Sequence, residues 1–180
     1  FMDAVGLPEA HVVGHSLGGA VGLELALEHP QRVPSITLIC SAGLGPEING
    51  DYVDGFIGAG RRKELRPYLE SLFADPSLVN RRFVDDVLRF KRFDGVDSAL
   101  RAVAGKFVAG GQQAIDIRDR LAEITAPILV IWGAMDQIIP ASHAQGIPGP
   151  AKVEIIEGCG HMAQMEAASE VNRLIDRFLG

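Results

Sequence analysis

The sequence contains few cysteines and lacks several features that define common protein classes. Its 180 residues include only 2 cysteines, Cys40 and Cys159, which are too few for a disulfide framework. We therefore expect a reducing compartment, the cytoplasm. No run of about 18 uncharged apolar residues is present, so we expect no membrane-spanning helix and no membrane partner. The net charge of −6 argues against nucleic acid as a partner.

Two further absences concern bound groups and the start of the chain. There is no ligand spacing typical of a metal site and no glycine-rich loop that would cradle phosphates, so we expect no metal and no tightly bound cofactor. No signal peptide is visible. The first residues, Phe1-Met2-Asp3, read like the end of a helix, and we interpret the chain as a fragment of a longer protein. A hydrophobic content of 47% allows one domain with a sizeable core.

The most informative segment is Gly14-His15-Ser16-Leu17-Gly18, a G-x-S-x-G pattern. An apolar stretch precedes it and a segment rich in Ala, Leu and Val follows it, so the pattern predicts a tight turn from a strand into a helix. We expect a Cβ at Gly14 or Gly18 to collide with neighbouring backbone. Ser16 would be exposed at the end of the strand, and the Leu17 backbone N–H would point toward a developing oxyanion.

Strands and helices are expected to alternate outside the middle of the chain. The predicted strands are Ala10–His15, Val33–Ser41, Ile128–Trp132 and Lys152–Ile156, and the predicted helices are Leu17–His29, Gln112–Ile124, Ala141–Gly146 and about Met162–Leu179. Unbroken apolar runs in the second and third strands are typical of parallel strands covered on both faces. Right-handed crossovers then give an α/β fold, a mostly parallel sheet flanked by helices.

Residues 45–111 differ from the rest because they are charged, irregular and rich in predicted helix. The helices expected there are Arg62–Phe73, Leu78–Phe93 and Asp97–Val108. We interpret residues 45–111 as a helical cap inserted into a core made of residues 1–44 and 112–180. Clustered basic residues in this cap, including Arg61-Arg62-Lys63, are more typical of a solvated helix face than of a docking surface for an anionic ligand.

Three chemically suited side chains follow predicted strands: Ser16 the first, Asp136 the third and His161 the fourth. Chemistry in parallel sheets collects at the carboxyl ends of strands, so loops far apart in sequence can meet there. A serine nucleophile needs a base, and a histidine oriented by a carboxylate can serve as one.

Several alternatives stay open at this stage. Asp51, Asp54 and Glu157 are rivals for the acid, and Cys159 with His161 is a weaker nucleophile–base pair. His15 is expected to point away from Ser16 as a packed, hydrogen-bonded residue. It is also a candidate for an apolar substrate pocket, together with Met135 and Met162.

The order Ser…Asp…His, within GHSLGG, WGAMDQIIP and GCGHMAQME, resembles the α/β-hydrolase family. The resemblance covers the whole chain and implies that Ser16 is the nucleophile, Asp136 the acid, His161 the base and Leu17 an oxyanion donor. Within that family, Gly60–Ala104 is similar to the cap of the hydrolase-like C-terminal domain of the dihydrolipoyl acetyltransferase component in bacterial acetoin dehydrogenase complexes. That similarity implies acetyl transfer from a lipoyl group to coenzyme A through an acetyl-serine, with a lipoyl domain as partner. The basic cap residues Arg61, Arg62 and Lys63 would help to bind coenzyme A.

The resemblance also implies that strands preceding the nucleophile, and the loop with the second oxyanion N–H, lie outside this chain. Loss of one oxyanion donor costs on the order of 10²–10³ in turnover. The first strand would then be an unpaired apolar edge, so we expect a homo-oligomer formed through Ala10–Val13. Two alternative functions remain: a stand-alone carboxylester, thioester or C–C hydrolase acting on a small acyl substrate, and a non-catalytic assembly module.

Overall fold

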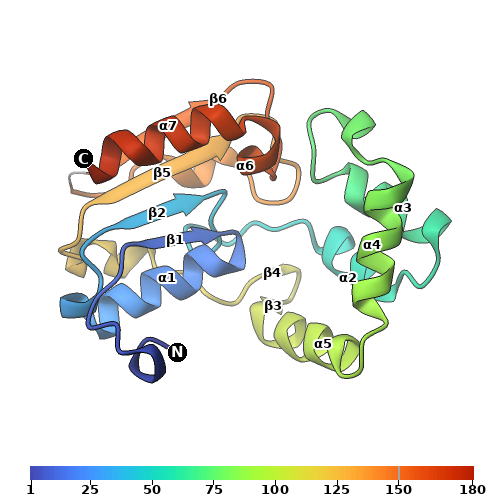
Figure 1. The fold of residues 1–180 in the computed structure, drawn as a ribbon, viewed down its shortest axis with the longest axis horizontal. Coiled ribbons are helices and arrows are strands. Elements are labelled where there is room, and N and C mark those ends of the chain that lie inside the picture. Colours follow the sequence, from blue (N-terminus) through green and yellow to red (C-terminus); the bar gives the residue numbers. More distant parts are fainter. Residues whose placement is uncertain (150) are drawn as a thin grey trace.

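The fold is a parallel sheet flanked by helices, seen in a computed structural model that describes residues 1–149 and 151–180 (Figure 1). The sheet strands are β1 (Val12–His15), β2 (Ile36–Ile39), β5 (Ile128–Gly133) and β6 (Lys152–Ile156), and a small hairpin consists of β3 (Val108–Ala109) and β4 (Gln112–Gln113). The helices are α1 (Leu17–Glu28), α2 (Gly50–Gly58), α3 (Arg62–Glu70), α4 (Arg81–Lys91), α5 (Val96–Phe107), α6 (Ala163–Glu166) and α7 (Ala168–Leu179). Short 3₁₀ turns lie at Asp3–Val5, Pro30–Arg32, Pro76–Leu78, Arg118–Glu123 and Ala141–Ala144.

The sheet has the strand order β1-β2-β5-β6, and all its pairs are parallel. Every residue of β2 and β5 is buried, which explains their almost entirely apolar sequences: both faces of these central strands are covered. Helix α1 packs on β1 and β2, and α7 packs on β5. Because parallel strands end at one edge, the residues after β1, β2, β5 and β6 come together there.

Helices α2 to α5 gather beyond the arrowheads of β2 and β5, at the carboxyl edge of the sheet (Figure 1). The chain reaches them after Gly43 and returns from them at Gln113. The Gln113 side chain, on the returning segment, is hydrogen-bonded to the outgoing segment. Its Oε1 accepts from the Gly43 N–H and its Nε2 donates to the Glu47 carbonyl, each at 2.9 Å. The division into a 45–111 cap and a two-part core stays a prediction, and its boundary after residue 111 falls inside the β3–β4 hairpin.

Three expected helices are wrong. The short helix expected at Ala141–Gly146 is a 3₁₀ turn over Ala141–Ala144. The α-helix predicted at 112–124 is absent. Residues 112–113 form β4, and only residues 118–123 are helical, as a 3₁₀ turn. Hydrogen bonds from the Gln113 side chain to Gly43 and Glu47 replace the local hydrogen bonds of a helix there. The last helix is interrupted at Ala167, whose φ of −127° separates α6 from α7. By contrast, α3 continues through Pro67.

Within the described residues, no helix combines the length and the apolar character needed to cross a bilayer. The cytoplasmic location expected from cysteine content stays a prediction.

Candidate active site

Ser16 occupies a strained turn between β1 and α1. Its φ of 53° lies in a region that costs a non-glycine residue about 1–3 kcal/mol. Three backbone hydrogen bonds hold it there: its N–H donates to Ile39, and its carbonyl accepts from Gly19 and Ala42, at 2.9–3.0 Å. The predicted strand–turn–helix geometry is confirmed. Leu17 is the first residue of α1, where a backbone N–H has no intrahelical acceptor.

The prediction for the flanking glycines is half right. A Cβ at Gly14 would lie 2.4 Å from the Gly18 carbonyl oxygen, whereas a Cβ at Gly18 would meet nothing within 4 Å. The second close approach is at Gly19 instead, where a Cβ would lie 2.0 Å from the Ser41 Oγ. The turn therefore needs glycine at 14 and 19, because α1 begins directly against the backbone of β1 and the end of β2.

Asp136 follows β5, and hydrogen bonds to both oxygens of its carboxylate hold it in place. Oδ1 accepts from the backbone N–H groups of Ile138 and Ile139 at 2.8 and 3.0 Å. Oδ2 lies 2.8 Å from Nδ1 of His161. The Asp136 side chain is 0% exposed and that of His161 only 3%. A buried carboxylate that accepts three hydrogen bonds orients the imidazole and keeps Nδ1 protonated.

His15 brings the serine turn and the His161 loop into contact. Its Nε2 donates to the His161 carbonyl at 2.9 Å, and the two rings lie 4.8 Å apart. Burial, and then the nearby His161, lower the pKa of His15. A neutral, hydrogen-bonded His15 agrees with the packed role expected for it. The Ser16 hydroxyl itself makes no hydrogen bond in the part of the chain that the structure describes.

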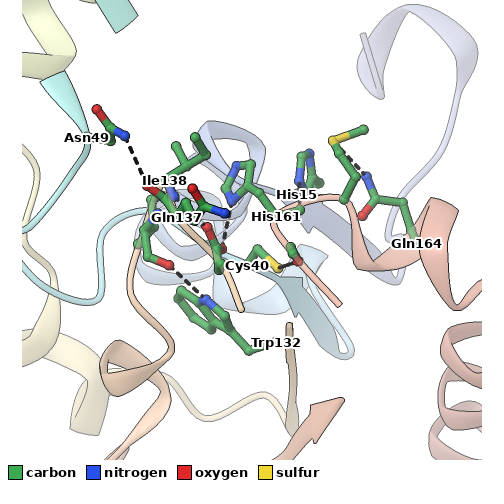
Figure 2. Close-up of polar contacts among 12 residues, drawn as sticks. His15, Cys40, Asn49, Trp132, Gln137, Ile138, His161 and Gln164 are labelled. Carbon is green, nitrogen blue, oxygen red and sulfur yellow. Dashed lines mark hydrogen bonds and ion pairs between the residues drawn. The ribbon is translucent and has the colours of Figure 1, made fainter. Parts of the chain in front are cut away.

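Cys40, at the end of β2, is a neighbour of the site that the sequence reasoning missed. Its Sγ, an Asp136 oxygen and a His161 ring nitrogen lie within 4.8 Å of one another, and Figure 2 shows Cys40 and His15 beside the His161 ring. The thiol is fully buried, donates to the Gly160 carbonyl at 3.8 Å, and has a pKa raised by burial. The rule that placed Asp136 and His161 at strand ends would have found Cys40 too.

Such a trio could in principle hold a metal ion. However, both Asp136 oxygens are already engaged by backbone N–H groups and by His161, so hydrogen bonds account for the arrangement. The other cysteine, Cys159, is buried, and burial raises its pKa. A protonated thiol is a poor nucleophile.

The rival acids make no hydrogen bond to His161 among the described residues; Asp51 and Asp54 are exposed on α2, and Glu157 is exposed after β6. Met135 is 51% exposed and Met162 is half-buried, so their place in a substrate pocket stays a prediction. A cavity of about 610 Å³ lies within the cap, lined by α2, α5 and the β3–β4 hairpin rather than by Ser16 or His161.

The comparisons with known proteins concern the family and the fold. The sequence model described as "alpha/beta hydrolase fold" matches residues 1–168. The dihydrolipoyllysine-residue acetyltransferase component of the acetoin cleaving system of Cupriavidus necator is 47% identical over 180 residues, which cover 100% of this chain and 48% of that protein. The corresponding component of Pseudomonas putida is 49% identical over 178 residues, with 99% of this chain and 47% of that protein covered. The chain thus spans about half the length of these curated relatives.

A third relative and a solved structure are named as hydrolases. The 2-hydroxy-6-oxo-6-phenylhexa-2,4-dienoate hydrolase of Comamonas testosteroni is 32% identical over 195 residues, covering 99% of this chain and 65% of the hydrolase. A meta-cleavage product hydrolase structure from Pseudomonas fluorescens IP01 superposes with a TM-score of 0.87 at 22% identity, covering 99% of this chain and 67% of that one. At that identity the likeness concerns the fold alone.

Proposed function

We propose that this chain, which belongs to the α/β-hydrolase fold family, transfers acyl groups through a covalent acyl-serine on Ser16. His161 would be the general base and Asp136 the acid that orients it. The observation that carries the proposal is the enclosed His161–Asp136 hydrogen bond of 2.8 Å, which engages Nδ1 and leaves the other ring nitrogen, Nε2, to accept a proton. His15 keeps this loop in contact with the turn that carries Ser16.

In the proposed reaction, His161 Nε2 takes the Ser16 proton while Oγ attacks the acyl carbonyl carbon. The Leu17 N–H donates to the oxyanion of the tetrahedral intermediate. The bond from carbon to the leaving group then breaks, and the imidazolium returns its proton to that group. For a thioester, the leaving group departs as a thiol, and a second thiol or a water repeats the sequence on the acyl-serine.

The names of the two most similar relatives reported above favour an acetyl group donated by a lipoyl group and accepted by coenzyme A. In this proposal a lipoyl domain delivers the acyl group, and neither substrate is a resident cofactor. A cap groove of about 460 Å³ offers a place for the coenzyme A phosphates, with four arginines around one acidic residue; its lining is Arg61, Arg62, Asp85, Leu88, Arg89 and Arg92. Lys63, which the sequence had suggested, does not line this groove.

A second candidate is hydrolysis, with water as the acceptor and an ester, a thioester or a C–C bond as the substrate. The similarity to the Comamonas hydrolase favours it. The two candidates share the acyl-serine and differ in the second half of the reaction. A non-catalytic assembly role is the remaining alternative.

The test is labelling of the complete protein with a fluorophosphonate probe. We expect one label per chain, lost in Ser16→Ala and kept in Ser142→Ala, a matched change at an exposed serine. Absence of labelling in the unsubstituted protein would refute the acyl-serine and leave the assembly role.

The acceptor is tested with acetyl-dihydrolipoamide and a choice of coenzyme A, pantetheine or water. Removal of a charged hydrogen bond costs about 1.5–3 kcal/mol, so Arg61→Ala with Arg62→Ala should raise the KM for coenzyme A about tenfold or more. The KM for pantetheine, which has no phosphate, should not change, and Arg173→Ala on α7 is the control. Product formed only with water would select the hydrolase instead.

A further inference from the structure

Glu166, the last residue of α6, binds two segments that are far apart in the sequence. Its Oε2 accepts from the backbone N–H of Gly160 at 2.7 Å, directly before His161. Its Oε1 accepts from the N–H groups of Ala74 at 2.7 Å and Asp75 at 3.4 Å, in the cap loop that follows α3. One half-buried carboxylate therefore joins the cap to the loop of the proposed base.

The same cap loop contacts the His161 loop through its backbone. The Met162 N–H donates to the Leu72 carbonyl at 3.2 Å. A Cβ at Gly160 would lie 2.8 Å from the Ala74 nitrogen and 2.9 Å from the Leu72 oxygen. Residues on both sides of His161 thus pack directly against residues 72–75, and no side chain fits between them. Figure 1 shows α6 on the side of the core that faces the cap.

The Glu166 carboxylate is not used in a charge pair with any described residue. Among the described residues Glu166 forms no ion pair with an Arg, Lys or His, while its neighbour Glu170 pairs with Arg173 on the surface. Both Glu166 oxygens are used on backbone donors instead. Hydrogen bonds from N–H groups to a carboxylate are shorter and stronger than neutral ones, so the contact resists displacement.

We propose that Glu166 is a positioning residue that couples the cap to His161: it holds the Gly160–His161 peptide at a fixed place against residues 72–75. The inference rests on the proposed function, in which His161 is the base. A cap displaced by a bound acyl group would then shift the His161 backbone, and a misplacement of about 1 Å at a reacting group costs about 10² in rate.

The test uses Glu166→Gln in the complete protein, because an amide has nearly the same shape but only one acceptor oxygen. One of the two backbone donor sets then faces an NH₂ group. We expect kcat and the rate of fluorophosphonate labelling at Ser16 to fall about 10- to 100-fold, with KM nearly unchanged. Glu170→Gln is the matched control and should leave all three quantities at their original values.

A readout independent of turnover is the low-field proton resonance of His161 Nδ1–H in the bond to Asp136. Glu166→Gln should shift or broaden this resonance, while Glu170→Gln should not. Thermal unfolding identifies a variant that does not fold, in which case Glu166→Asp, with both oxygens on a shorter stem, replaces it in the same measurements.

The outcomes separate the two proposals. A folded Glu166→Gln protein with an unchanged resonance and unchanged labelling overturns the positioning role, as does a raised KM with unchanged kcat. Absence of labelling in the unsubstituted protein overturns the acyl-serine, and the resonance alone then decides whether Glu166 positions His161.

Discussion

Nδ1 of His161 lies 2.8 Å from Oδ2 of Asp136, and the two side chains are almost completely enclosed, at 3% and 0% exposure. The second Asp136 oxygen is held by two backbone N–H groups, so the carboxylate cannot rotate away from the ring. Between side chains so deeply buried, such a charge-assisted bond fixes both the orientation and the tautomer of the imidazole.

Asp136→Asn should lower kcat on the order of 10³–10⁴-fold, because an amide NH₂ facing Nδ1 favours the wrong tautomer. Substrate binding should change little, since the side chain is enclosed. Steady-state kinetics of the complete protein measure this effect. Asp176→Asn, an exposed change on α7, is the control, and equal kcat values in the two variants would contradict the role of Asp136.

Gly14→Ala and Gly18→Ala should have opposite effects on stability. The new methyl at position 14 would lie 2.4 Å from the Gly18 carbonyl oxygen, and such overpacking costs about 1–3 kcal/mol or more. At Gly18, an exposed helix position with free space, alanine should stabilise by about 0.5–1 kcal/mol. Urea unfolding provides both values. Similar destabilisation by the two changes would show that the close approach is misplaced.

His15 should make the protein less stable in mild acid. Burial is the main cause that lowers its pKa below the ordinary 6.5, so the unfolded chain binds a proton more readily than the folded one. The free energy of unfolding therefore falls as the pH drops from 6.5 through the lowered pKa. Denaturant unfolding at about pH 7 and about pH 5 measures the fall. His15→Gln should reduce this fall in the free energy of unfolding, whereas His29→Gln, at an exposed position, should not. Identical pH dependences in the two variants would argue against His15 as the cause of the fall.

The outer edge of β1 should mediate self-association of the 180-residue chain, as proposed from its sequence. Val13 on this strand is 52% exposed, and β1 lies at one edge of the sheet. An apolar strand with unpaired backbone groups readily pairs with another. Sedimentation equilibrium should show dimers that Val13→Lys converts to monomers, while Val103→Lys in the cap leaves them intact. A monodisperse monomer without any substitution would disprove the edge contact.

The sequence predicted those elements whose local pattern matches their surroundings. The apolar runs of β2 and β5 indicated central strands, and both are buried throughout. The serine turn was expected from its glycines and its flanking strand and helix. The helix expected over residues 112–124 failed because Gln113 bonds to Gly43 and Glu47, which no periodicity within the segment can reveal. The break at Ala167 likewise has no local signal, since its neighbours are good helix formers.

The sequence by itself determined the four strands of the parallel sheet, the tight turn at Ser16 and the placement of Asp136 and His161 after strand ends. These follow from short-range sterics and from apolar patterning. Only the tertiary structure decided that His15 contacts His161 and that Glu166 joins Gly160 to Ala74. Such contacts between segments distant in the chain depend on how the packed sheet and cap bring the loops together, and no local preference encodes that.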